Sequence, residues 1–351
     1  MPEKSQLPES PLRLRLSRTA LIGNWCWLSA QSHGAACGAA IKADGYGLGA
    51  VEVARTLTEA GCRDFFVATW AEAAKVAPKL GGCSLSVLHG VRPADMAIAL
   101  SSSARPVLNS VEQVVLWRDA GGGPCDVMID TGMNRLGVSM DEVVAGALDG
   151  LTIDTLMSHL ASADEDCAQN GAQLQSFMAA KARVTARAYS LANSAGICLG
   201  RDYAFDLTRP GLALYGGVPR AKAAGHIAQV VFPEAETLQL RDVGAGAPVG
   251  YNATWTAREP CRIATINLGY ADGYLRGFSG AGGARFGEHR LPVIGRVSMD
   301  LVTLLVPDGC AIAAGDWVGI DYDLPIASAI SGLSQYELLT GLGQRYARAW
   351  D

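Results

Sequence analysis

Short apolar runs alternate with helix-like stretches over the first two thirds of the chain, from about residue 17 to about residue 225. The runs expected to form buried strands are 38–43, 64–70, 85–90, 104–110, 125–131, 153–159 and 197–207. Helical spacing lies between them, for example in 50–61, 111–121 and 173–196. This alternation predicts parallel strands joined by crossover helices. Seven or eight such units in about 210 residues favour a closed (β/α)8 barrel of the TIM type over an open sheet.

The pattern changes after about residue 226. Segments that alternate with period two and are interrupted by Gly, Pro or Asp cover 226–243, 262–273, 289–306 and 316–323. This spacing predicts a second domain of mainly antiparallel β structure. We therefore expect an N-terminal tail over 1–16, a barrel over 17–226 and a β-rich domain over 227–351.

Composition narrows the class of protein. The chain has 351 residues, of which 49% are hydrophobic and 18% charged, and this balance favours a well-buried globule. The net charge of −5 gives no reason to expect a nucleic acid or an anionic membrane as a partner. Residues 1–17 have no apolar core or cleavage pattern, so we expect a short disordered tail and a cytoplasmic protein. The nine cysteines are scattered singly, which predicts reduced thiols and no metal site.

The first sign of chemistry is the segment AAIKADGYGLGA, residues 39–50, where Lys42 follows an apolar run. Such a lysine is often a surface residue whose ammonium group reaches water. Another interpretation is chemical, because a desolvated lysine loses its proton easily and can hold an aldehyde as a Schiff base. The glycines that follow allow a tight turn and the close approach of a bulky ligand. This segment alone does not decide between the two.

Seven further motifs follow in a fixed order. They are IDTGMNRLGV (129–138), LMSHLASADE (156–165), ANSAG (192–196), FDLTRPGLALYG (205–216), PVGYNATW (248–255), LGYADGYLRG (268–277) and VIGRVSMD (293–300). With the lysine segment, this set resembles the alanine racemases, which are pyridoxal-phosphate enzymes of fold type III. The resemblance covers roughly residues 11–349, and it rests on all eight motifs in this order rather than on any one of them.

The resemblance implies a racemisation with two acid/base groups, because one group cannot remove a proton and return it from the opposite face. Lys42 would bind the cofactor and act on one face of the substrate Cα. Tyr251 of the GYNATW segment would act on the other face, from the partner chain of a homodimer. His159 would hydrogen-bond to that tyrosine, and Arg276 would lie behind it. The resemblance also implies that LRLRLS, residues 12–17, pairs into the C-terminal domain.

Arg209 matches the family arginine that faces the pyridine nitrogen of the cofactor. An arginine donates a hydrogen bond but keeps its proton, so the ring nitrogen would stay unprotonated and electron withdrawal would be moderate. Side reactions such as transamination and decarboxylation would then be limited.

The remaining positions implied by the resemblance bind the cofactor or the substrate. Those for the cofactor, in addition to Lys42, His159 and Arg209, are Tyr46, Asn193, Ser194, Gly211, Leu212 and Tyr346. Those for the substrate are Arg135, Met299 and Tyr270. Gly-rich turns and helix starts suit a phosphate, because their N–H groups are free to donate.

The sequence departs from the family pattern at three positions. Met128 stands where some members have a carbamylated lysine that pairs with the arginine, here Arg135. Gln344 stands where some members have a phosphate-binding tyrosine, with Tyr346 nearby, and Leu48 replaces a common histidine. The first departure leaves the breadth of substrates open.

The function expected is the interconversion of L- and D-alanine, supplying D-alanine for peptidoglycan. The main alternative is a broad-specificity amino-acid racemase that also accepts serine. A pyridoxal-phosphate decarboxylase is disfavoured by Arg209, and a non-catalytic carrier of the cofactor by the presence of a C-terminal domain with Tyr251 and Met299.

Overall fold

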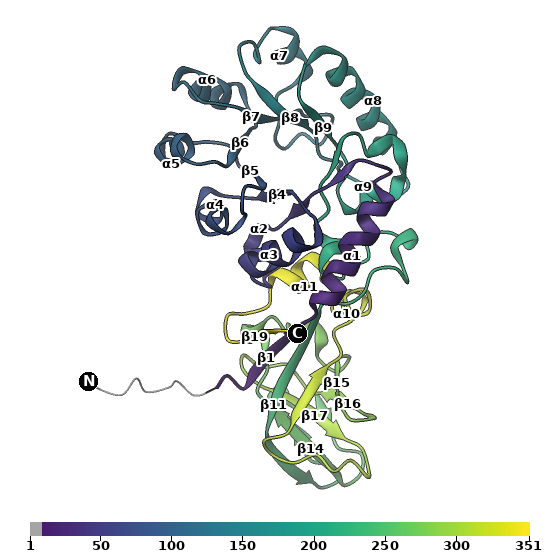
Figure 1. Cartoon of the computed structure of the whole chain (residues 1–351). Helices are drawn as coiled ribbons and strands as arrows, with labels where there is room; N and C mark the ends of the chain where they lie inside the picture. Colours follow the sequence, from purple (N-terminus) through teal and green to yellow (C-terminus); the bar gives the residue numbers. More distant parts are fainter. Residues whose placement is uncertain (1–8) are drawn as a thin grey trace, which may run out of the picture. The chain divides into compact units, whose positions relative to one another are not determined.

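The computed structural model describes residues 9–351, so residues 1–8 of the expected N-terminal tail lie outside it. The chain divides into two compact units. One is Thr19–Ala228, and the other joins the described residues up to Arg18 with Gln229–Asp351. Figure 1 shows the helices and strands of the two units.

The first unit contains a parallel sheet of seven strands that pair in sequence order. The strands are β3 (Ala39–Ala40), β4 (Asp64–Val67), β5 (Ser84–Val87), β6 (Arg105–Leu108), β7 (Cys125–Met128), β8 (Ile153–Met157) and β9 (Ala188–Ser190). Short strands buried on both faces are typical of a parallel sheet covered by helices. The order of pairing matches the predicted alternation of strand and helix.

An eighth strand, β10 (Leu207–Thr208), pairs in parallel with β2 (Ala36–Cys37). Before this strand, the amide of Asp206 donates to the carbonyl oxygen of Tyr189 in β9 at 2.9 Å. After it, the carbonyl oxygen of Pro210 accepts from the amide of Ala40 in β3 at 2.8 Å. Backbone hydrogen bonds thus connect the last strand with both ends of the series. The unit is a TIM-like barrel, which confirms the predicted fold class.

Helices connect the barrel strands and cover their outer side (Figure 1). They are α1 (Arg18–Gln31), α2 (Lys42–Tyr46), α3 (Ala50–Ala60), α4 (Trp70–Val76), α5 (Met96–Ser101), α6 (Val111–Asp119), α7 (Met140–Val144), α8 (Ala168–Arg183) and α9 (Ser194–Leu199). Short 3-10 turns add η1 (Ala77–Lys79), η2 (Pro93–Asp95), η3 (Arg201–Tyr203), η4 (Leu212–Tyr215) and η5 (Ala221–Ala223).

The predicted elements are wrong in one region of the barrel. Residues 197–207 were expected to form a strand, but α9 and η3 occupy most of that segment. The strand lies instead at β9, inside 173–196, which was expected to be helical. Alanine-rich sequence favours a helix by propensity, whereas tertiary pairing with β8 forms the strand.

The second unit is an eight-stranded sheet in the order β14-β17-β16-β15-β18-β11-β1-β19. The strands are β1 (Leu12–Leu16), β11 (Val231–Val243), β14 (Cys261–Ile266), β15 (Gly283–Phe286), β16 (His289–Ile294), β17 (Val302–Val306), β18 (Trp317–Ile320) and β19 (Ala347–Trp350). All pairs are antiparallel except β1 with β19. A register shift near Thr237 lets β11 pair with β18 and also with β14, so six of the strands close on themselves.

Smaller elements complete this second unit. They are a two-stranded ribbon of β12 (Pro248–Val249) with β13 (Trp255–Thr256), the 3-10 turns η6 (Tyr251–Ala253), η7 (Tyr270–Asp272) and η8 (Arg276–Phe278), and the helices α10 (Leu324–Ser331) and α11 (Gln335–Thr340). The turns η6, η7 and η8 carry Tyr251, Tyr270 and Arg276, whereas Met299 lies between β16 and β17 and Tyr346 lies directly before β19.

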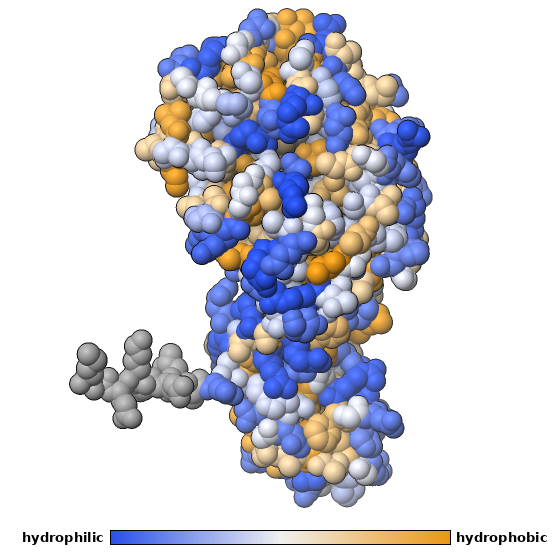
Figure 2. All heavy atoms as spheres, in the orientation of Figure 1, coloured by the Kyte–Doolittle hydropathy of each residue, from blue (hydrophilic) through white to orange (hydrophobic). Residues whose placement is uncertain are grey.

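Hydrophilic and hydrophobic side chains are interspersed over the surface visible in Figure 2. Over residues 9–351, none of the helices combines the length and the apolar character that a membrane span needs.

Candidate active site

Lys42 lies two residues after the end of β3, at the carboxyl end of the first barrel strand, which is the end where barrel enzymes carry their reactive groups. The turn that follows it is left-handed, with positive φ at Ala43 (52°), Asp44 (54°), Gly45 (65°) and Tyr46 (56°). Backbone hydrogen bonds close this turn, for example from the Gly47 amide to the Ala43 carbonyl oxygen at 2.8 Å. The turn therefore has a defined geometry and is not a loose loop.

This turn is costly to form. Left-handed helical backbone costs roughly 1–2 kcal/mol per residue that has a Cβ. Ala43, Asp44 and Tyr46 together then cost about 3–6 kcal/mol. Such strain persists only where neighbouring structure holds it, and it is concentrated at functional sites.

Burial lowers the pKa of Lys42, and the nearby positive charges of Arg135 and Arg209 lower it further. The carboxylate of Glu72 acts in the opposite direction. A lowered pKa leaves more of the lysine as the neutral amine, the form that attacks an aldehyde or accepts a proton. The chemical interpretation of Lys42 therefore has physical support in the barrel.

Three residues that were predicted to hold a phosphate lie next to this turn. The Tyr46 hydroxyl is so close to Gly211 that a Cβ added there would lie 2.2 Å from it. Ser194 Oγ accepts from the amides of Gly211 (2.9 Å) and Ala213 (3.2 Å). The predicted residues Tyr46, Ser194 and Gly211 are thus brought together from three distant segments. Asn193, also predicted, caps α9 by accepting from the Gly196 amide at 2.9 Å.

Tyr215 supports this group, although it was not singled out from the sequence. Its ring stacks on that of Tyr46 with the centroids 4.6 Å apart, and its hydroxyl donates to the Ala40 carbonyl oxygen at 2.9 Å. It is fully buried. Its place in the run LALYG indicates apolar packing and gives no sign of this role.

Arg209 is buried inside the barrel, only 6% exposed. Its guanidinium donates to Ser190 Oγ and to the Ser158 carbonyl oxygen at 2.5 Å. Burial lowers its pKa to about 10, and the negative charge of Asp126 limits that fall. Arg209 therefore remains protonated at neutral pH, as its predicted role requires.

His159 follows β8 at the same face of the barrel. Burial, together with the charges of Arg209, Arg135 and Lys42, lowers its pKa to about 3. The imidazole is therefore neutral throughout the physiological pH range. The same electrostatic effects show that these four predicted residues gather in one place.

Arg135 is carried by a loop that Asp130 shapes. The Asp130 Oδ1 accepts from the amides of Gly132, Met133 and Asn134 at 2.9, 3.0 and 3.1 Å. Within residues 9–351 the Arg135 side chain makes no ion pair, and buried Met128 offers it none. The guanidinium is therefore available to an anion.

A buried glutamine on α8 links the loops of this site, and the sequence analysis missed it. Gln173 Nε2 donates to the His159 carbonyl oxygen (2.9 Å) and to Thr131 Oγ1 (3.1 Å), and its Oε1 accepts from the Ala161 amide (2.8 Å). No motif in the sequence marks it. Gln173 holds the backbone from His159 to Ala161 and ties it to Thr131.

The second unit carries the other predicted residues. Tyr251 is 68% exposed and Met299 is 53% exposed. Tyr251 lies in a strained turn with positive φ at Gly250, Asn252 and Ala253. Exposure at both positions suits residues whose partners belong to another chain.

Tyr270, Arg276 and Met299 lie on two adjoining loops of this unit. The amides of Tyr270 and Ala271 donate to the carbonyl oxygens of Ser298 and Met299, each at 3.0 Å. The Arg276 guanidinium carbon lies 5.4 Å from the centroid of the Tyr270 ring.

Arg345 holds these two loops together, and it too was missed. It forms a bidentate pair with Asp272 at 2.7 and 2.8 Å and contacts Asp300 at 2.7 Å. Two aspartates in the predicted motifs, with no assigned role, were the only sign. Tyr346 beside it is 5% exposed, and burial raises its pKa well above the usual value, whereas Gln344 is exposed.

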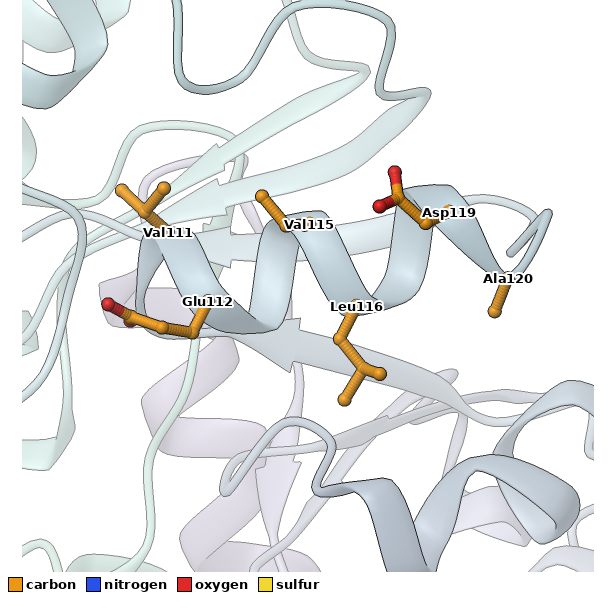
Figure 3. Close-up of a pocket in the computed structure, with 6 residues that line it drawn as sticks. All are labelled: Val111, Glu112, Val115, Leu116, Asp119 and Ala120. Carbon is orange, nitrogen blue, oxygen red and sulfur yellow. The ribbon is translucent and has the colours of Figure 1, made fainter.

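A surface hollow of about 510 Å³ lies on α6, lined by residues 111, 112, 115, 116, 119 and 120 (Figure 3). None of the predicted site residues lines it. Its valine and leucine side chains lie on the outer side of the barrel, away from the carboxyl ends of the strands where the reactive groups gather.

The barrel site fits pyridoxal phosphate on its own chemistry. It combines a lysine of lowered pKa with two arginines, and donors from Tyr46, Ser194 and the loop at Gly211 surround the adjoining turn. A surplus of positive charge suits a ligand with a phosphate and a phenolic oxygen, and a substrate with a carboxylate.

Comparison with known proteins agrees with this picture. The family models "Alanine racemase, N-terminal domain" and "Alanine racemase, C-terminal domain" match residues 16–219 and 230–350. An alanine racemase of Acidiphilium cryptum is 42% identical, over 95% of this chain and 97% of its own. A catabolic alanine racemase of Agrobacterium fabrum is 41% identical, over 96% and 91%. The crystal structure of a Bartonella henselae alanine racemase with covalently bound pyridoxal phosphate has a TM-score of 0.90 at 34% identity, over 98% and 100%.

Proposed function

The chain belongs to the alanine racemase family, and from that membership and the barrel site we propose that it interconverts L- and D-alanine by a two-base mechanism. The family models, the curated relatives and the solved structure confirm the family, the enzyme class and the pyridoxal phosphate cofactor that were expected from the sequence. The observation that carries the proposal is the convergence of Lys42, Arg135, His159 and Arg209 at the carboxyl ends of the barrel strands.

When bound, pyridoxal phosphate supplies an electron sink that makes the α-proton of an amino acid more acidic. Lys42 would hold the cofactor covalently, and Tyr46, Ser194, Gly211 and Leu212 would hold its phosphate. Arg209 would donate to the pyridine nitrogen without giving up its proton, because its pKa stays near 10.

The substrate carboxylate would be held by Arg135 and by the backbone N–H of Met299. These two contacts with the carboxylate would orient the Cα–H bond so that the proton, rather than CO2, is removed. Lys42 Nζ would move the proton at one face and Tyr251 Oη at the other. His159, neutral at working pH, can accept or donate a hydrogen bond to the tyrosine without adding a charge.

The enzyme would act as a homodimer in which Tyr251 and Met299 enter the partner's site. Their exposure within the C-terminal unit supports this arrangement. Inactive Lys42→Ala and inactive Tyr251→Phe chains, refolded together in equal amounts, test it. Random pairing makes half the dimers mixed, each with one intact site of two, so activity should recover to about 25% of wild type. No recovery, with mixed dimers confirmed by mass spectrometry, would rule out a shared site.

The reaction itself is tested by incubating the protein with single enantiomers and separating the products by chiral chromatography. L-alanine should yield D-alanine, and the reverse, until the two are equal, while Lys42→Ala should give neither. A panel that includes serine measures substrate breadth, which Met128 leaves open. If alanine keeps its configuration while another amino acid racemises, the proposed substrate is wrong.

The physiological role would be the supply of D-alanine for peptidoglycan. A strain without this gene, and without other sources of racemase, should then grow only with added D-alanine. Growth without D-alanine would point to the use of alanine as a nutrient instead.

A further inference from the structure

A carboxylate supports the strained turn that follows Lys42. The backbone N–H of Ala43 donates to Glu72 Oε1 at 2.7 Å. Other amides of the turn, those of Gly45, Gly47 and Gly49, bond to backbone carbonyl oxygens of residues 41–44. Ala43, the residue joined to Lys42, depends on a side chain instead.

The carboxylate of Glu72 is itself held in place. Its Oε2 accepts from the amides of Ala68 (2.7 Å) and Thr69 (3.2 Å), and its own amide donates to Thr69 Oγ1 (3.3 Å). This capping box starts α4 immediately after β4. Glu72 therefore connects the rigid end of β4 with the turn of Lys42.

The bond to Ala43 is not a requirement of helix capping. Glu142 forms a capping box with Ser139, and Glu337 forms one with Ser334. Their carboxylates accept from their own cap residue, at 2.8 Å in each case, and from no distant segment among the described residues. Unlike these two glutamates, Glu72 also accepts from a backbone amide of a distant segment.

From this contrast we propose that Glu72 is a positioning residue for Lys42, with its carboxylate bracing the left-handed turn 43–47 against the start of α4. The inference deepens the proposed function, on which it rests for the role of Lys42. Its chemical reason is preorganisation, since a nucleophile presented from a fixed turn needs no reordering before it reacts.

The charge of the Glu72 carboxylate also affects the pKa of Lys42. Burial and the charges of Arg135 and Arg209 disfavour the ammonium form of Lys42, and Glu72 favours it. These are the charged groups that act on Lys42, and His159 nearby is neutral. Removal of the Glu72 charge should lower the pKa of Lys42 further, so the amine fraction at a given pH should rise.

The test compares Glu72→Gln with two matched controls in the full-length protein. Thr69→Ala weakens the same helix cap but keeps the bond to Ala43, and Glu142→Gln makes the same change in another capping box. Hydrogen exchange with mass spectrometry follows the peptide that spans 41–47. Competitive labelling with acetic anhydride over a range of pH, after removal of the cofactor, gives the pKa of Lys42.

In Glu72→Gln, exchange in 41–47 should be about tenfold faster, because a neutral amide cannot replace both carboxylate contacts. The pKa of Lys42 should fall, and neither control should change either readout. Glu72→Asp keeps the charge but is one methylene shorter, so it should speed exchange while the pKa of Lys42 stays close to that of wild type.

Wild-type exchange rates in a folded Glu72→Gln or Glu72→Asp protein would overturn the inference. So would rapid exchange of 41–47 in the wild-type protein, which needs no variant to fold. Neither readout requires turnover, so their failure is distinct from a wild-type protein that racemises nothing, which would overturn the proposed function instead.

Discussion

Gln173→Met should destabilise the barrel and reduce racemisation together. Gln173 is fully buried, and methionine has a similar length but cannot donate or accept these hydrogen bonds. The change would leave the His159 carbonyl oxygen and the Ala161 amide without their present partners. Thr131 Oγ1 would keep its bond with Ser158 Oγ at 2.7 Å.

The magnitude follows from those two groups. Each buried polar group left unpaired costs about 1–3 kcal/mol, so the two groups together cost about 2–6 kcal/mol. Because the surrounding structure relaxes in part, we expect the free energy of unfolding to fall by about 3 kcal/mol, in the lower half of that range. For a domain of roughly 200 residues, 1 kcal/mol lowers the Tm by about 2–4 °C, so the Tm should fall by roughly 6–12 °C.

The assay is thermal unfolding at fixed protein and cofactor concentration, with kcat and KM for alanine measured well below the transition. Gln169→Met is the matched control on the same helix, since Gln169 is exposed and water can replace its hydrogen bonds with Ser162 Oγ (2.8 Å) and the Gly132 carbonyl oxygen (3.3 Å). It should shift the Tm by less than about 2 °C. Equal effects of the two substitutions, or an unchanged Tm in Gln173→Met, would refute the reasoning from buried hydrogen bonds.

Three further predictions concern the reactive groups. Lys42→Ala should abolish both racemisation and the chromophore that borohydride fixes to the wild-type chain, and a retained, fixable chromophore would show that another residue binds the cofactor. Arg209→Glu should slow racemisation and raise the share of turnovers that end in transamination, measured as pyruvate formed per D-alanine, and an unchanged share would contradict the role of a permanently protonated arginine. The pKa of His159 is about 3 in the folded protein and near 6.5 in the unfolded chain, so the unfolded chain binds a proton first as the pH falls. His159 should therefore lower the free energy of unfolding by up to about 1.4 kcal/mol for each pH unit below pH 6.5. His159→Gln should flatten the fall in stability between pH 6.5 and pH 4.5, and parallel wild-type and variant curves would show that His159 is not buried as a neutral group.

The fold could be predicted to the level of architecture. Apolar runs mark β4 to β8 because strands buried on both faces are mainly apolar, and period-two alternation marks the second unit because its sheet has one buried face. Prediction failed at β9, where three residues of alanine-rich sequence have no pattern of their own. Pairing with β8 determines that strand, and the periodicity of a single sequence gives no information about which strands pair.

The chemistry of the candidate site could be predicted from motifs, but its supports could not. Lys42 and Arg209 belong to motifs whose residue types suit the proposed reaction. Gln173 and Arg345 touch backbone or carboxylates and are ordinary polar residues in the sequence. Their roles come from burial and from partners far along the chain, such as Asp272 for Arg345.

The lysine segment shows the limit most clearly. The sequence predicts a tight turn after Lys42 because of its glycines, yet the strain is concentrated at Ala43, Asp44 and Tyr46, which all carry a Cβ. Glycine at every one of these positions would remove the strain and also loosen the turn, because glycine loses more entropy on folding. A turn that is strained and held from outside presents its lysine in one geometry. The sequence therefore indicates where the proposed nucleophile lies, whereas the contact that holds its turn comes from Glu72, thirty residues further along the chain.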